Sequence, residues 1–160
     1  MQYILASKDR MFAADVLGAV GSRDYSGYLL ELLDATDPLV VDKAIIPTGT
    51  VKDVRLVAKL VDKLANPAHL DRAGVALQQH GEGALLDLER SLSNPLVTRV
   101  VRRKVVGILQ EIDSNRTTDI LLQRNDIDDS ELRNHVYIAL ANLRYQAADD
   151  DRYKFVYTVN

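Results

Sequence analysis

The strongest charged feature of this chain is a cluster of four basic residues, Arg99, Arg102, Arg103 and Lys104. In a helix the residues at 99, 102 and 103 lie on one face, because residues three and four apart are neighbours. Such a face could bind an acidic protein segment or anionic lipid headgroups, where each cation near a charged leaflet contributes roughly 1 kcal/mol. We therefore take Arg99, Arg102, Arg103 and Arg133 as candidate partner-binding residues.

The same basic residues have a structural interpretation, which is the commoner outcome for a charged helix face. In that interpretation the cations form a ladder between neighbouring helices and pair with acids such as Asp71, Glu111 and Asp113. Reversing the charge at Arg102 and Arg103 separates the two interpretations. A loss of partner binding with little change in melting temperature indicates a binding face, and a large loss of stability indicates the ladder.

The three histidines do not form a recognisable metal site. His69, His80 and His135 lie far apart in the sequence, and none belongs to a His-x-x-x-His pair. Isolated histidines are weak predictors of metal binding, so we expect them at the surface or at repeat ends. The chain has no cysteine, which excludes thiolate zinc sites and disulfides.

The acidic stretch Asp126, Asp128, Asp129 and Glu131 is the last candidate for a binding site. It lacks the Gly and the closing Glu of an EF-hand loop, so we expect an ordinary polar turn. The sequence also has no Gly-rich phosphate loop and no nucleophile elbow. It therefore predicts a protein that is not an enzyme, with no catalytic residue, no cofactor and no metal.

Composition and charge restrict the classes of partner. The 160 residues are 47% hydrophobic and 27% charged, which is typical of one folded domain. The formal net charge of −3 argues against a nucleic-acid partner, because sequence-independent binders usually carry a basic surface. No apolar run approaches the roughly 20 residues that span a bilayer.

A repeat runs through the chain and indicates how these residues are positioned. Turn signals recur at Asp37-Pro38, Asn66-Pro67, Asn94-Pro95 and Asp128-Asp129, at intervals of 28 to 34 residues. Helix stops are expected at Gly21, Gly49, Gly81 and Asp113. Each unit is predicted to form two amphipathic helices around a turn, and such a unit must stack on its neighbours to bury its apolar face. The sequence thus predicts an all-α solenoid.

The second helix of each unit is expected to line one surface of the stack. We place these helices at residues 40–46, 70–80, 98–112 and 131–144, after a single helix at 8–20. Pro47-Thr48-Gly49 is expected to end or kink the first of them, because proline cannot donate a hydrogen bond to a continuing helix. Ser130 with Glu131 is expected to begin the last one.

Two segments resemble HEAT repeats of the short, bacterial, phycobilisome-lyase-like type. One contains Gly83-Ala84-Leu85-Leu86, Ser93-Asn94-Pro95 and the helix at 101–109, and the other comprises residues 128–133 and 139–144. In that family an Asp-Pro turn is followed by an arginine that enters the second helix. Arg72, Arg99 or Arg102, and Arg133 occupy this place, whereas the first full repeat has Asp42-Lys43 instead.

The resemblance implies a right-handed α-α superhelix of about four and a half helical hairpins, with residues 1–160 as a single HEAT-repeat domain. It implies a non-catalytic module that binds a protein partner or an anionic surface through a concave face. Iron-binding hydroxylases of similar fold carry His-Glu dipeptides, but here His80 is followed by Gly81 and only then by Glu82. DNA glycosylases of similar fold hold a damaged base in a basic concave surface with aromatic residues. This chain is acidic and has no tryptophan, which argues against that activity.

A narrower resemblance concerns the Arg102-Arg103 pair together with the final Ala139-Leu140 and Leu143-Arg144. It is similar to HEAT domains fused behind ADP/ATP-translocase-like membrane transporters of bacteria. It implies a cytoplasmic domain that is cut from a longer chain and tethered to the inner membrane through a parent transporter, and the aromatic tail Tyr153, Phe155 and Tyr157 agrees. The alternative is a stand-alone chaperone or adaptor that resembles phycobilin lyases. A saturable absorbance shift on titration with bilin would favour the adaptor.

Overall fold

The computed structural model of this chain describes residues 6–112, 114–124 and 129–143. In this part of the chain all regular structure is helical, which confirms the predicted all-α class. The α-helices are α1 (Ser7–Val20), α2 (Ser26–Leu33), α3 (Pro38–Val51), α4 (Val54–Lys63), α5 (Leu70–His80), α6 (Leu85–Ser93), α7 (Arg99–Glu111), α8 (Asn115–Leu122) and α9 (Ser130–Asn142). The short 3-10 helices η1 (Arg23–Tyr25) and η2 (Gly81–Ala84) precede α2 and α6. None of the described helices combines the length and the hydropathy needed to cross a membrane.

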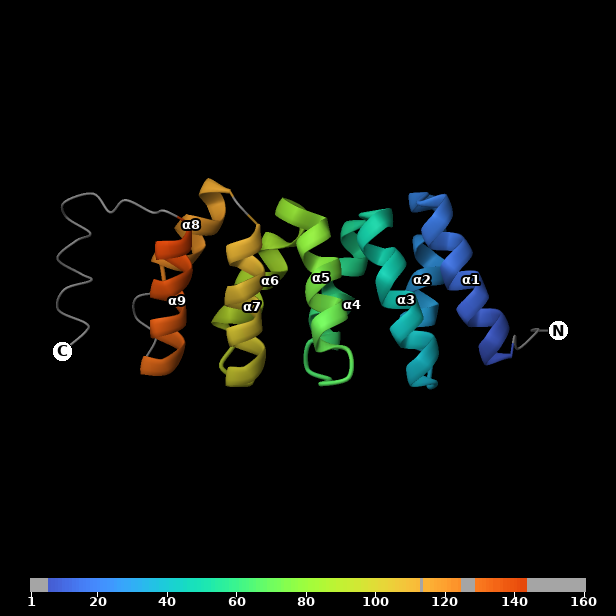
Figure 1. The fold of residues 1–160 in the computed structure, drawn as a ribbon, viewed down its shortest axis with the longest axis horizontal. Coiled ribbons are helices and arrows are strands. Elements are labelled where there is room, and N and C mark those ends of the chain that lie inside the picture. The colour runs from blue at the N-terminus through green and yellow to red at the C-terminus, as the bar shows by residue number, and fades with distance from the viewer. Residues whose placement is uncertain (1–5, 113, 125–128, 144–160) are drawn as a thin grey trace.

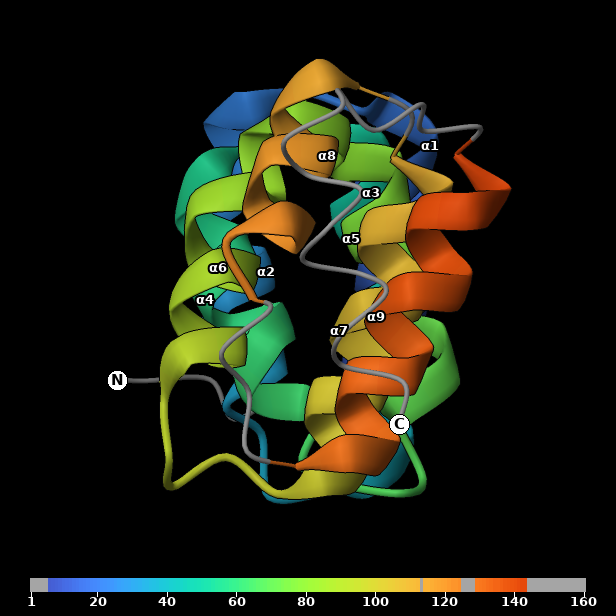
Figure 2. The ribbon, with the colours of Figure 1, turned by 90° about the vertical axis from the view of Figure 1, so that its left-hand side faces the viewer.

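The helices form two layers that run along the long axis of the molecule (Figures 1 and 2). One layer, the odd layer, contains α1, α3, α5, α7 and α9, and each of these helices packs against the next. The other, the even layer, contains α2, α4, α6 and α8, of which α2 contacts α4 and α4 contacts α6. The described residues therefore hold four helical hairpins, α2–α3, α4–α5, α6–α7 and α8–α9, preceded by α1.

The core lies between the two layers and continues from hairpin to hairpin. Each helix after α1 contributes Leu, Val, Ile or Ala side chains that are almost completely buried. A single hairpin leaves apolar surface exposed along its two sides. Stacking against the neighbouring hairpins removes this surface from water. The largest fully buried side chains belong to Leu29, Leu33, Ile45, Leu56, Leu60, Leu64, Leu77, Leu85, Leu88, Ile108, Leu109 and Leu121.

Side-chain caps begin most of the second helices where the turn signals predict. Asp37 accepts a hydrogen bond from the N–H of Leu39, and Pro38 occupies the first turn of α3, where its missing donor has no consequence. Thr98 caps α7. α9 begins at Ser130, as predicted, with Glu131 in its first turn, and the preceding Asp129 is the cap that accepts from the N–H groups of Glu131 and Leu132.

The prediction that Pro47-Thr48-Gly49 ends the second helix of the first full repeat is wrong, because α3 does not end at Pro47 or Gly49. It continues from Pro38 to Val51, with Pro47 inside it, and ends at Lys52 in the left-handed conformation. Proline is compatible with helical φ and removes one hydrogen bond, while packing against α1 and α5 on either side stabilises the helix around it. Gly49 is therefore a buried residue of a helix and not a stop.

Other predicted boundaries agree with the structure. The helix at 70–80 has the predicted ends, and Gly81 follows it with a φ of 59°. The helix at 8–20 is α1, whose place in the odd layer makes it the second half of a repeat, and Gly21 caps it with a φ of 65°. Asp113, Asp126, Asp128, Arg144 and the aromatic tail, for which predictions were also made, lie outside the described residues.

Candidate interaction surface

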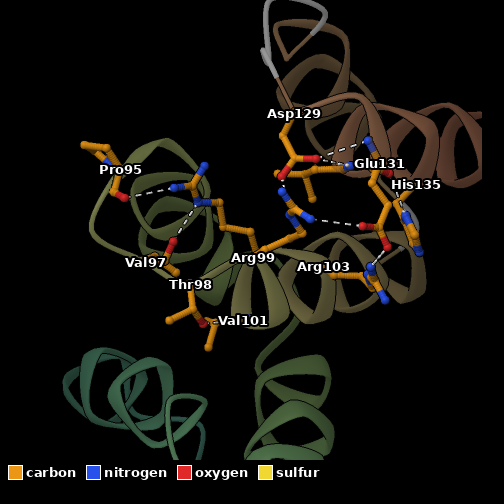
Figure 3. A network of polar contacts seen from close by, with 11 residues as sticks. Pro95, Val97, Thr98, Arg99, Val101, Arg103, Asp129, Glu131 and His135 are labelled. Carbon is orange, nitrogen blue, oxygen red and sulfur yellow. Dashed lines mark hydrogen bonds and ion pairs between the residues drawn. The ribbon is translucent and has the colours of Figure 1, made fainter.

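Three of the four candidate partner-binding residues lie on α7 and the fourth on α9. The Nε of Arg99 donates to Asp129 at 2.5 Å, and its Nη1 lies 3.2 Å from Glu131. Arg103 also pairs with Glu131 (Figure 3). The two arginines thus hold the first turn of α9 against α7, and hydrogen bonds from the backbone N–H of Leu132 and then from Arg99 lower the pKa of the Asp129 carboxyl.

Arg102 points away from this network, towards the turn that precedes α7. Its Nε donates to the carbonyl oxygen of Val97 at 2.9 Å, and its Nη2 donates to that of Pro95 at 3.0 Å. Backbone carbonyl groups need a hydrogen-bond donor, and this half-buried guanidinium supplies one to each of these two, so it ties the α6–α7 turn to the helix. Arg133 is half-buried on α9 and has an interaction partner of its own.

Three further cations of the odd layer form a ladder between consecutive helices. Lys43 on α3 lies 3.5 Å from Asp15 on α1. Two further rungs follow, since Arg72 on α5 pairs with Asp42 on α3, and Lys104 on α7 pairs with Asp71 on α5 at 2.7 Å. The Lys104 rung is one of the pairings that the structural interpretation of the sequence predicts. Glu111, another predicted partner, makes no ion pair with any described residue.

A single register relates the helices of this layer after α1. In each one a buried small or β-branched residue occupies the same place, namely Ala44, Ala73, Val105 and Val136, at intervals of 29 to 32 residues. The ladder cation stands one position before it, as Lys43, Arg72 and Lys104. Two positions before it stand Asp42, Asp71, Arg103 and Asn134, so the sign of the charge reverses at α7.

That reversal explains why α9 is held differently from the other helices. Because Arg103 stands where α3 and α5 carry an aspartate, it cannot accept a cation from the next helix. It pairs instead with Glu131, an acid one turn earlier on α9. In the rungs up to α7 the later helix supplies the cation and the earlier helix the acid. Between α7 and α9 this is reversed, because α7 supplies the cations of the basic cluster and α9 supplies the acid. Binding of a partner by these cations stays a prediction.

Three glycines of the odd layer lie against a side chain of the next helix. A Cβ at Gly18 would lie 2.7 Å from the Cβ of Pro47, one at Gly49 would lie 2.9 Å from the Cδ of Gln79, and one at Gly74 would lie 2.7 Å from the Cε of Lys104. Each glycine therefore admits a side chain from the next helix. The glycine at 107 differs, since a Cβ there would meet no atom within 4 Å.

An exposed row of apolar side chains crosses the same layer, and sequence reasoning missed it. Two positions after the buried reference residue stand Ile46, Val75, Gly107 and Ile138, and the three apolar side chains are 55%, 53% and 58% exposed. We call these four positions the apolar row. They are exposed because the other sides of each helix face the neighbouring helices and the even layer. The available signal was an apolar residue out of phase with the core in three of the four helices.

The borders of the apolar row are polar. On one side lies the ladder, whose charges neutralise one another. On the other side, four residues further along each helix, stand Thr50, Gln79, Glu111 and Asn142. Of these, Asn142 donates to Gln110 of α7 at 3.1 Å. The charged residues along the ladder border are therefore paired with one another. Along the other border Glu111 is the one charged residue of these four.

His69 and His80 lie at the two ends of α5, which agrees with the predicted repeat ends. The alternative of a surface position is wrong for both, because they are only 4% and 9% exposed. His69 lies 3.4 Å from Asp42, and burial lowers the pKa values of both histidines. His135 contacts the carbonyl oxygen of Glu131 on its own helix. Among the described residues no three His, Asp or Glu side chains form a group that could hold a metal ion.

A hollow of about 540 Å³ lies apart from this surface, between η1 and the start of α4. Its lining mixes cations and acids, namely Arg23, Asp24, Lys52, Asp53 and Arg55 together with Gly27 and Val54. Asp53 caps α4 and holds the Arg55 side chain, and hydrogen bonding to this guanidinium lowers the pKa of the Asp53 carboxyl far below its usual range. The hollow therefore has no strong preference for ligands of one charge.

Neither a model of a known protein family nor a curated protein matches this chain.

Proposed function

We propose that this chain is a non-catalytic HEAT-repeat module that binds another protein through the odd layer. In this proposal the helical hairpins form a right-handed superhelix whose concave face is lined by α3, α5, α7 and α9. Support comes from the repeat of 29 to 32 residues, from ladder rungs that recur at equivalent positions, and from glycines that let successive helices pack closely.

The observation that carries the proposal is the apolar row. Ile46, Val75 and Ile138 leave more than half of their surface in water at positions where a solvated helix face usually has polar residues. Isolated exposed apolar residues are common, but equivalent placement on successive repeats aligns these along one surface. Fully burying an exposed side chain of this size contributes roughly 1.5–3 kcal/mol, and these three are already close to half buried, so each adds roughly 1–1.5 kcal/mol when a partner covers it.

A pair of matched variants tests the proposal. One carries Ile46→Asp, Val75→Asp and Ile138→Asp on the odd layer. The control carries Tyr28→Asp, Val54→Asp and Leu86→Asp, which replace side chains of comparable exposure on the even layer. Both are used, beside the wild type, to capture proteins from an extract of the source cells, and the captured proteins are quantified by mass spectrometry.

We expect specific partners to bind the wild type and the even-layer control but not the odd-layer variant. Circular dichroism and thermal unfolding establish that all three proteins are folded. Partners that bind all three equally, or that are lost only from the even-layer control, would place the binding surface elsewhere and would contradict the proposal.

A further inference from the structure

Gly107 is the one glycine within an odd-layer helix of the described chain that stacking does not explain. Gly18, Gly49 and Gly74 each lie against a side chain of the next helix. Gly107 is exposed in the middle of α7, and an added Cβ would enter open space. Glycine weakens a helix interior relative to alanine, so the chain keeps a destabilising residue where alanine would fit. Local rules are broken in this way chiefly at functional positions.

The place of Gly107 in the apolar row indicates what the missing side chain admits. Its equivalents on the neighbouring helices are Val75 on α5 and Ile138 on α9, both exposed apolar residues. The row is thus interrupted at α7 by bare helix backbone with apolar side chains on both sides. A large apolar side chain from outside the chain could lie over Gly107, in line with Val75 and Ile138 on the two neighbouring helices.

The charges beside Gly107 favour a bound segment that carries a positive charge. The cations Arg103 and Lys104, one turn before it, are already paired with Glu131 and Asp71. One turn after it stands Glu111, which is exposed and makes no ion pair with any described residue. An acidic segment would compete with carboxylates of the chain itself, whereas a basic residue would find Glu111 available.

We propose that the partner presents an extended segment in which a large apolar residue seats over Gly107 and a neighbouring lysine or arginine pairs with Glu111. This inference rests on the proposed binding function and specifies its ligand. An extended chain in the polyproline II conformation suits the surface, because neighbouring helices pack about 8–10 Å apart and one turn of three residues covers about 9 Å and returns a side chain to the same face. Successive apolar side chains of one segment can therefore reach successive repeats.

Selection from a random library of short linear peptides tests this inference on the whole chain. The wild type is used as bait, and enriched peptides are synthesised with a fluorophore and titrated by fluorescence anisotropy. We expect the enriched sequences to combine a Leu, Ile, Met or Phe with a neighbouring Lys or Arg. A library that yields only acidic peptides, or none above the background of unloaded support, would overturn the inference.

Substitutions at Gly107 and Glu111 locate the bound peptide. Gly107→Leu fills the gap, and we expect it to weaken binding by about tenfold or more, as when a central apolar anchor is displaced. Glu111→Gln should weaken binding about threefold, and high salt should remove that difference. Gly27→Leu and Glu31→Gln are the matched controls, because both residues are exposed on α2 and the Cβ at 27 also meets nothing within 4 Å.

The outcomes distinguish this inference from the proposed function. If Gly107→Leu binds the peptides as the wild type does while Ile46→Asp with Val75→Asp does not, the odd layer binds but the seat over Gly107 is wrong. If the cellular partners identified by capture also bind Gly107→Leu with unchanged affinity, the inference falls and the proposed function stands. Gly107→Leu is exposed and lies in a helix, so its melting temperature should not decrease, and loss of binding by a folded variant is interpretable.

Discussion

Gln79 of α5 lies across Gly49 of α3, so that a Cβ added at position 49 would lie 2.9 Å from the Cδ and 3.2 Å from the Cβ of Gln79. Both residues belong to the surface along which the two helices stack. The contact explains why a glycine is placed in the interior of a helix, where it is otherwise unfavourable. It also makes the spacing of two repeats depend on a single missing methyl group.

Gly49→Ala should therefore destabilise the fold, although alanine is the better helix former. We expect a loss of about 1 kcal/mol in the free energy of unfolding, because the exposed end of Gln79 can rotate away but its Cβ, 3.2 Å from the new atom, must shift. Urea denaturation followed by circular dichroism measures it. The double variant Gly49→Ala with Gln79→Ala should recover part of the loss, because the longer side chain is then absent. Additive losses in the double variant would show that this contact is not the cause.

Residue patterns predicted the helical class and several boundaries because those features are local. The helix at 70–80 is bounded by a turn signal and by Gly81, and the structure has the same ends. The predicted helix end in the first full repeat was wrong because Pro47 and Gly49 disfavour a helix locally, and packing against α1 and α5 outweighs that preference. Pro47 lies against Gly18 of α1 and Gly49 against Gln79 of α5, and neither neighbour can be identified from α3 alone.

The candidate surface was predictable only in part for the same reason. Sequence reasoning identified Arg99, Arg102 and Arg103 as one charged group and named Asp71 as a possible partner of the cluster. It could not assign the acids to individual cations, because that depends on which helices are adjacent in the odd layer. Nor could it distinguish Gly107 from Gly74, since only the neighbouring helix decides whether a Cβ has room.

Replacing a glycine of the odd layer by alanine should raise the free energy of unfolding at one position and lower it at another. Gly107→Ala should raise the free energy of unfolding by up to about 1 kcal/mol, because helix propensity improves and no atom is displaced. Gly18→Ala should lower it, since the Cβ of Pro47, which cannot move without its own backbone, would lie 2.7 Å from the new Cβ. Parallel urea denaturation of both variants checks the order. A loss of stability in Gly107→Ala would mean that its surroundings are more crowded than the structure has them.

The arginines of α7 should differ in their contributions to stability despite their adjacency in sequence. Arg103→Ala should change the free energy of unfolding by less than about 0.5 kcal/mol, because its ion pair with Glu131 is exposed to water. Arg102→Ala should cost about 1–2 kcal/mol, because it leaves the carbonyl oxygens of Val97 and Pro95 without their donor.

Salt provides the control for this pair of arginine variants. High salt should remove the small effect of Arg103→Ala and leave most of the effect of Arg102→Ala, since screening acts mainly on exposed charges. Equal costs for both variants, or a large cost at Arg103, would indicate that the ladder stabilises the stack more than its exposure suggests.

Stability should also decrease in mildly acidic solution because of His80. Burial lowers the pKa of this histidine from its ordinary value of 6.5, and the positive charge of Lys52 acts in the same direction against the opposing influence of Asp53 and the Thr48 backbone. The unfolded chain therefore binds a proton more readily than the folded one. The stability that neutral His80 contributes is fully present above about pH 6.5 and decreases as the pH falls towards the lower folded pKa.

Urea denaturation at about pH 7.5 and about pH 5.5 measures this effect on the free energy of unfolding. The aspartates with lowered pKa values, among them Asp53, Asp71 and Asp129, titrate below their ordinary value of 3.8 and do not act in this window. His80→Gln removes the titrating group, and we expect it to lose less stability between the two pH values than the wild type does. Burial lowers the pKa of His69 in the same direction, so a smaller dependence should remain in that variant. An unchanged pH dependence in His80→Gln would mean that His80 is solvated well enough to be protonated in the folded state.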